Sequence, residues 1–215
     1  MIFPTGSLIV SCQAQPSSPF HGPAGMTLMA RAAVFGGAAG IRANGAADIA
    51  AVHAAVDVPI LGISKTGDPD GVYITPTFGS AAPLVEAGAA VVGLDATDRP
   101  RPEPLPELIA RVHGELGVPV LADVDSLAAG VTAAAAGADL VATTLSGYTG
   151  GPVPPEPDVE LVHSLAVEID CPIVAEGRYW TPSDVSAALE AGATAVVVGT
   201  AITNPTAITR RLVQR

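Results

Sequence analysis

Eight short apolar segments, separated by segments with helical spacing, constrain the fold of this chain most strongly. Each is rich in Val, Ile, Leu and Ala, and continuous apolar runs of this length fit strands that are buried on both faces. The predicted strands span residues 7–13, 40–44, 58–65, 89–97, 118–123, 139–145, 171–176 and 193–199.

Alanine-rich segments fill the intervals and predict helices. These helices span residues 26–35, 46–56, 80–86, 103–116, 127–136, 157–169 and 182–190. Several close on Gly-Ala, at Gly88, Gly137 and Gly192, where glycine suits a left-handed C-cap and the next strand follows at once. The Pro-rich stretches 99–106 and 150–157 each follow a predicted strand, so they indicate long loops and not domain boundaries.

Alternation of eight strands with helices predicts a (β/α)₈ TIM barrel of the α/β class. The 215 residues are enough for one such domain, and we expect residues 1–215 to form it. A doubly wound open sheet is the alternative, because strand count alone does not prove closure.

The net charge and the cysteine content limit the kinds of partner and site that we expect for this protein. The formal net charge of −11 disfavours nucleic acid and anionic membrane, because both are polyanions, and an anionic ligand would need its charge met locally. Cys12 and Cys171 suggest neither a disulfide framework nor a metal cluster. No apolar run is long enough to span a bilayer and no signal peptide is visible, so we expect a cytoplasmic location.

Polar residues gather where the predicted strands end. In a (β/α)₈ barrel these ends form the active-site face. Any one of these residues could instead cap a helix, but together they predict a ring around a site. The set comprises Gln13, Arg42, Asn44, Lys65, Asp95, Asp123, Thr143, Thr144, Glu176 and Arg178.

Lys65 is the most informative residue of this set, because it is the only lysine in the chain. Burial at a barrel mouth and a neighbouring cation such as Arg42 would lower its pKa and leave part of it neutral. A neutral amine can act as a general base or form a Schiff base with a carbonyl. Lys65 could instead stay charged and pair with a phosphate or a carboxylate.

Glu176 ends the seventh predicted strand, four strands from the strand of Lys65, so a barrel would place the two side chains opposite each other. Such a pair could remove a proton from one face of a planar intermediate and return it on the other. The alternative is that Glu176 only pairs with Arg42 or Arg178. Gly177 and Gly199 lie where barrels often bind phosphate on backbone N–H groups, although both could be ordinary turn residues.

These motifs, taken in series, resemble the N-acetylmannosamine-6-phosphate 2-epimerase family. The matching pieces are "SCQA", "GIRANG", "VYITPT", "LDATDRPRP", "ADVDS", "TTLSGYT", "AEGR" and "GTAIT". The resemblance covers nearly the whole chain. It implies a (β/α)₈ barrel that uses no metal and no organic cofactor and interconverts N-acetylmannosamine 6-phosphate and N-acetylglucosamine 6-phosphate at C2.

The resemblance also implies roles. Lys65 and Glu176 correspond to the catalytic pair, while Gln13, Arg42 and Asp123 correspond to residues that hold the sugar and its acyl-amine. Arg178 lies in the "EGR" motif near the phosphate end. We expect Gly177, Gly199 and Thr200 to bind the phosphate of a small-molecule amino-sugar phosphate.

Three positions depart from the family pattern. Asn204 stands where the family has an arginine that we associate with the phosphate, and a neutral amide supplies no charge-assisted contact. Arg178 or Arg210 would then have to compensate. Thr200 replaces a second glycine, and Asp125 adds a carboxylate that could perturb the sugar site.

The mechanism implied is deprotonation of the open-chain aldehyde at C2 by Lys65, which gives an enediolate-type intermediate. Glu176 would supply the proton on the other face, or orient the substrate while the same proton is returned. A Schiff-base aldolase or lyase and a non-catalytic sugar-phosphate binder are the alternative functions. Barrels of this kind often form homodimers, but the sequence shows no surface stripe for that contact.

Overall fold

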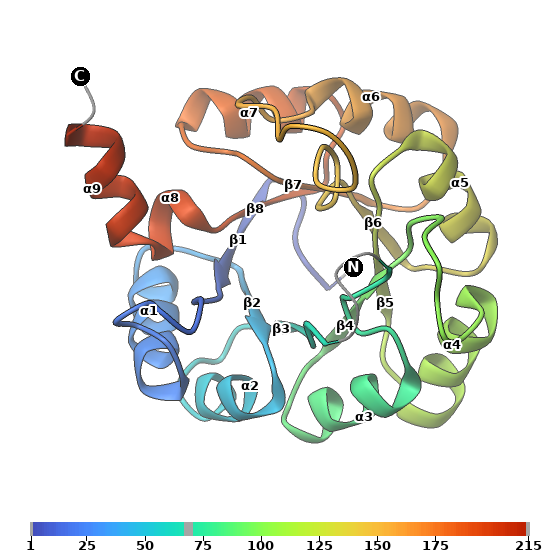
Figure 1. Ribbon diagram of the computed structural model, residues 1–215, viewed down its shortest axis with the longest axis horizontal. Coiled ribbons are helices and arrows are strands. Elements are labelled where there is room, and N and C mark those ends of the chain that lie inside the picture. Colours follow the sequence, from blue (N-terminus) through green and yellow to red (C-terminus); the bar gives the residue numbers. More distant parts are fainter. Residues whose placement is uncertain (1, 67–70, 214–215) are drawn as a thin grey trace.

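Eight parallel strands close into a barrel in the computed structural model, which describes residues 2–66 and 71–213 (Figure 1). The strands follow one another around the barrel in chain order, and the last pairs with the first, with Leu8 opposite Val196 and Val10 opposite Val198. This closure confirms the predicted (β/α)₈ barrel and excludes an open, doubly wound sheet.

Each strand is followed by at least one helix, and the helices after the first seven strands cover the outside of the barrel. The strands are β1 (Ser7–Cys12), β2 (Gly40–Asn44), β3 (Ile60–Ile63), β4 (Val91–Asp95), β5 (Val120–Asp123), β6 (Leu140–Ala142), β7 (Ile173–Glu176) and β8 (Ala195–Val198). The helices are α1 (Pro23–Phe35), α2 (Ala46–His53), α3 (Phe78–Glu86), α4 (Leu105–Arg111) with the π-helix η1 (Val112–Leu116), α5 (Leu127–Ala135), α6 (Val159–Glu168), α7 (Pro182–Glu190), α8 (Thr200–Thr203) and α9 (Pro205–Val213).

Most strands are shorter than predicted because apolar runs continue into the loops. The predicted strand 58–65 is observed as Ile60–Ile63, so Lys65 follows the strand and does not end it. The predicted helix 103–116 is one helical stretch whose second half is the π-helix. The short helix α8 and the helix α9 were not among the predicted helices.

The Gly-Ala motif ends helices as predicted. After α5, Gly137 has a φ of +98° and its N–H donates to the carbonyl of Ala134, while the N–H of Ala138 donates to the carbonyl of Ala133. This bonding satisfies carbonyls that a helix end would leave open, and the positive φ favours glycine. The same arrangement follows α3 at Gly88 and α7 at Gly192.

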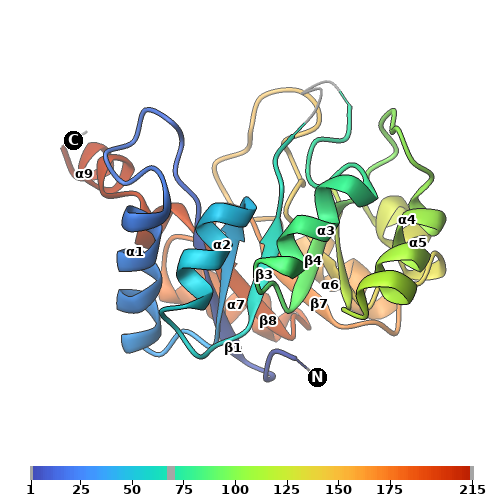
Figure 2. The ribbon, with the colours of Figure 1, turned by 90° about the horizontal axis from the view of Figure 1, so that it is seen from below.

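Two apolar layers hold the barrel. The inner layer fills the barrel with side chains such as Ile9, Leu61, Leu121 and Val174, and buried Phe3 from the N-terminal segment packs onto it. Figure 2 shows this segment at the side of the barrel where the strands begin. The outer, larger layer lies between strands and helices. The barrel is therefore a packed core, and the opposite mouth offers the place for a site.

The long segments after β1, β4 and β6, and the described residues between β3 and α3, rise on the side where the strands end (Figure 2). Cys12 and Cys171 are free thiols, and burial raises the pKa of Cys12 to about 12.

Among the described residues, no helix has the length and apolar character needed to cross a membrane.

Candidate active site

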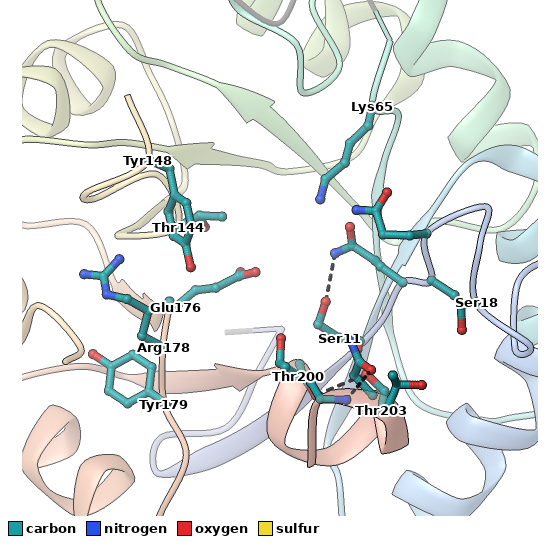
Figure 3. Close-up of a pocket in the computed structure, with 18 of the residues that line it drawn as sticks. Ser11, Ser18, Lys65, Thr144, Tyr148, Glu176, Arg178, Tyr179, Thr200 and Thr203 are labelled. Atoms are coloured by element: carbon teal, nitrogen blue, oxygen red, sulfur yellow. Dashed lines mark hydrogen bonds between the residues drawn. The ribbon is translucent and has the colours of Figure 1, made fainter. Parts of the chain in front are cut away.

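A cavity of about 860 Å³ opens at the mouth formed by the strand ends (Figure 3). This volume lies in the usual range for small-molecule sites. The wall is built from the segments that follow β1, β3, β6, β7 and β8, and from α8 and α9.

The floor beneath the cavity is a buried ion network centred on Arg42 of β2. Its guanidinium donates to both carboxylate oxygens of Asp123 at the end of β5, at 2.9 and 2.7 Å, and a further bond and ion pair reach Glu176. The side chains of Arg42 and Asp123 are fully buried. Burial alone would lower the pKa of Arg42, but the carboxylates of Asp123 and Glu176 raise it. Arg42 therefore stays charged and neutralises this floor.

Two threonines after β6 connect this network to the strand of Glu176. Thr144 donates its hydroxyl to Asp123 and also lines the cavity. The Thr143 hydroxyl donates to the backbone carbonyl of Glu176 at 3.0 Å and accepts from its N–H at 3.1 Å. Glu176 is thus held through its backbone by Thr143 and through its carboxylate by Arg42.

Glu176 ends β7 and projects into the cavity (Figure 3). Its side chain is 13% exposed. Burial raises the pKa of its carboxyl, and the charge of Asp123 adds to this effect, while Arg42 opposes it. Because the burial effect prevails, Glu176 holds a proton at a higher pH than an ordinary glutamate.

Lys65 points into the cavity from a different wall (Figure 3). The backbone N–H of Lys65 donates to the side-chain oxygen of Asn44 at 2.9 Å, and its backbone also forms an isolated antiparallel bridge with Ile74. Burial at the mouth lowers the pKa of its amine and the charge of Arg42 lowers it further, against Glu176 and Asp123. A larger share of the amine is therefore neutral than in an ordinary lysine.

Gln13 follows β1 and supplies an acceptor to the cavity wall. Its Nε2 donates to the hydroxyl of Ser11 at 2.8 Å. Its Oε1 is buried and accepts no hydrogen bond from the described residues. A buried polar atom without a partner is costly, so a ligand N–H would be favoured there.

Arg178 anchors a loop and does not extend freely into the cavity. Its φ of +64° is left-handed, and its guanidinium donates to the backbone carbonyls of Ser146 and Glu156. The same group lies over the Tyr148 ring, 5.4 Å from the centroid. Arg178 lines the cavity, these contacts tie it to the long segment after β6, and its role in binding the substrate stays a prediction.

Two carboxylates near the strand ends accept hydrogen bonds from residues of the loops. Asp95 accepts from Arg99 at 2.6 Å and from the N–H of Tyr73, which organises the segments after β3 and β4. Asp125 accepts from the hydroxyl of Thr149 at 2.7 Å and is not among the described residues that line the cavity. The expected disturbance of the sugar site by Asp125 is therefore not supported.

Gly177, Gly199 and Thr200 all line the cavity. Gly177 has a φ of +116°, which favours glycine directly after Glu176. A Cβ on Gly199 would lie 3.2 Å from the Cβ of Ser11, so glycine keeps β8 close to β1. Asn204 accepts the N–H of Ala207 at 3.0 Å, so it caps α9.

The cavity gathers most of the residues singled out in the sequence. Lys65, Glu176, Gln13 and Arg178 line it, together with the three proposed phosphate residues, whereas Arg42 and Asp123 lie beneath it. Sequence reasoning missed the aromatic wall of Tyr73, Tyr148, Tyr179 and Trp180. These are all the tyrosines and the only tryptophan of the chain, and that scarcity is the signal that could have found them.

Among the described residues, no group of three or more His, Cys, Asp or Glu side chains is arranged to hold a metal ion.

Comparisons with known proteins place the chain in a family. The model of the family described as "Putative N-acetylmannosamine-6-phosphate epimerase" matches residues 26–215. Relatives named as N-acetylmannosamine-6-phosphate 2-epimerases, qualified as putative, come from Cutibacterium acnes and Thermosynechococcus vestitus. The first is 49% identical over 95% of this chain and 91% of its own length, and the second 50% identical over 92% and 88%.

A solved structure agrees with these relatives. The N-acetylmannosamine-6-phosphate 2-epimerase from Clostridium perfringens superposes with a TM-score of 0.93 at 40% identity, covering 97% of this chain and 93% of that one. This protein therefore belongs to the N-acetylmannosamine-6-phosphate epimerase family.

Proposed function

We propose that this protein interconverts N-acetylmannosamine 6-phosphate and N-acetylglucosamine 6-phosphate by moving the proton at C2. The observation that carries the proposal is that Lys65, just after β3, and Glu176, at the end of β7, line one cavity from opposite strands of the closed barrel. Their pKa values are shifted in opposite senses, down for the lysine and up for the glutamate. A neutral base and a protonated acid are the pair that this reaction needs.

The proposed reaction starts from the open-chain aldehyde, whose C2 proton is acidified by the carbonyl at C1. The neutral amine of Lys65 takes this proton, and the C2–H electron pair forms a C1–C2 double bond as the carbonyl becomes an enolate. The carboxylic acid of Glu176 then gives a proton to the other face of C2, and the carbonyl reforms. Lys65 is left as ammonium and Glu176 as carboxylate, and proton exchange with water restores both.

The buried network supports this step by positioning Glu176. Arg42 and Asp123 lie under the cavity, so we propose that they act through Glu176 and through Thr144, whose hydroxyl they bind and which lines the cavity. Gln13 lines the cavity, and its buried Oε1, which accepts no hydrogen bond from the described residues, suits the N–H of an acyl-amine. Gly177, Gly199 and Thr200 offer close backbone approach for a phosphate at the wall formed by β7, β8 and α8.

A proton NMR time course with N-acetylmannosamine 6-phosphate tests the proposal. The N-acetylglucosamine 6-phosphate signals should appear with the wild-type protein and be about 10²–10⁴-fold slower with Lys65→Ala, since positioned acid–base groups contribute that much. An unchanged sugar at high protein concentration would refute the epimerase proposal. A substrate adduct trapped by borohydride on Lys65 would favour the Schiff-base alternative instead.

A further inference from the structure

The cavity is rich in positive charge although the chain is acidic. Three of the ten basic residues line it, Lys65, Arg178 and Arg210, while Glu176 is the one acidic residue among the described lining residues. The net charge of the whole chain is −11. A local excess of cations in such a protein indicates an anionic ligand.

Two of these three cations are less suited to binding an anionic ligand, because each is engaged elsewhere. Lys65 lies at the reacting end of the cavity, opposite Glu176. The guanidinium of Arg178 is engaged by the carbonyls of Ser146 and Glu156 and lies over the Tyr148 ring. Arg210 differs from both, since its guanidinium makes no hydrogen bond or ion pair with another described residue. Its five N–H donors are therefore available to a ligand.

Arg210 reaches the cavity from α9, the last helix. Thr206, Ala207 and Arg210 all line the cavity, and their spacing puts them on one face of this helix. The cap from Asn204 fixes where α9 begins, directly after α8. Figure 1 places α9 outside the ring of barrel helices, and Figure 2 places it on the side where the strands end.

Little of the protein holds α9 in place. None of its residues is buried, and it packs chiefly on α8. The guanidinium of Arg211 lies over the ring of Trp180, 4.5 Å from the centroid, and ties the helix to the segment after β7. An ion pair between Arg210 and a bound ligand would therefore add a substantial share of the contacts that fix α9.

We propose that Arg210 is the cation that binds the anionic end of the substrate, and that binding a phosphate monoester holds α9 against the barrel mouth. The inference rests on the proposed function and deepens it, because it assigns the counter-charge of the phosphate to a residue on the helix after Asn204. A planar guanidinium gives a phosphate two parallel hydrogen bonds, which suits this task.

Binding of inorganic phosphate tests the inference without turnover. Wild-type protein should show a rise in melting temperature with phosphate and slower amide hydrogen exchange in α9. Arg210→Gln should lose both effects. Arg31→Gln is the matched control, because Arg31 is an exposed arginine on α1 and is not among the residues lining the cavity. Equal phosphate responses in Arg210→Gln and wild type would overturn the proposal.

Kinetics separate this inference from the proposed function. Arg210→Gln should raise the KM for N-acetylmannosamine 6-phosphate roughly ten-fold or more, with little change in kcat, because a charge-assisted bond to the phosphate is lost in ground and transition states alike. Turnover of unphosphorylated N-acetylmannosamine should not change, and Arg210→Lys should recover part of the KM.

The outcomes are distinguishable. A wild-type protein without epimerase activity refutes the proposed function, yet phosphate binding that depends on Arg210 would still support the anion site. An active wild type whose KM is unchanged in Arg210→Gln refutes the anion site alone.

Discussion

Arg42 sets the charge balance of the site, because its buried guanidinium binds two carboxylates. It donates to both oxygens of Asp123 and to Glu176, and the Arg42–Asp123 pair has no exposure to water. Such a pair adds little net stability compared with apolar side chains, but breaking it leaves a buried charge unpaired.

Arg42→Met should therefore lower the free energy of unfolding by about 3–5 kcal/mol at neutral pH, as urea denaturation would measure. The double variant Arg42→Met/Asp123→Leu removes both members of the buried pair and should recover part of this loss while remaining inactive. If the midpoint urea concentration of Arg42→Met equals that of the wild type, Arg42 does not stabilise the fold by balancing the buried carboxylates.

Lys65 permits a direct reading of its own ionisation, because it is the only lysine of the chain. Protein labelled with ¹³C at the lysine ε-carbon should give one side-chain resonance, and its titration should give a pKa below that of an ordinary lysine. Glu176→Gln should move this pKa further down, since the Glu176 charge raises it. A pKa at or above the ordinary lysine value would contradict the general-base role.

Some candidate residues could be assigned to the barrel mouth from their positions in the chain alone. Lys65 and Glu176 could be selected because one is the sole lysine and both lie near strand ends on opposite sides of a barrel. The depth of Arg42 and Asp123 could not be predicted, because both are polar side chains near strand ends and only tertiary packing puts them below the cavity surface.

At the scale of elements, the long segment between β6 and α6 depends on Arg178. Its guanidinium bonds the carbonyls of Ser146 and Glu156, so one side chain connects both ends of this segment to the residues after β7. The segment also carries Tyr148 to the cavity wall.

Arg178→Gln should speed amide hydrogen exchange between residues 146 and 156 and lower kcat/KM, with a melting temperature close to that of the wild type. Arg178→Lys should fail to restore slow exchange, because an ammonium does not reproduce the planar fork that bonds two carbonyls. Hydrogen-exchange mass spectrometry makes the comparison. Wild-type exchange rates in both variants would show that Arg178 does not anchor the loop.

The strands and their order followed from the sequence, whereas several boundaries did not. Apolar residues continue past β3, so periodicity alone extended the predicted strand to Lys65. The helix α8 has only four residues, too few to show a helical repeat, and α9 buries none of its residues, so neither carried the apolar signal of a core helix.

At the scale of the whole molecule, stability resides in the closed barrel and not in the C-terminal helix. The inner and outer apolar layers contain no residue of α9 among their buried members. Deletion of residues 205–215 should therefore leave a folded barrel whose melting temperature falls by only a few degrees. Calorimetry measures the shift, and loss of the folding transition would show that α9 is required for the barrel.

The central claim is that Lys65 and Glu176 exchange a proton with C2 of the sugar, and a reaction in D₂O followed by proton NMR tests it most directly. Glu176 lines an open cavity, so the proton that its carboxylic acid gives to C2 exchanges with solvent deuterium beforehand. Proton transfer through these two side chains should form N-acetylglucosamine 6-phosphate from N-acetylmannosamine 6-phosphate with deuterium at C2. A product that keeps the original hydrogen at C2 would contradict proton transfer through these two side chains.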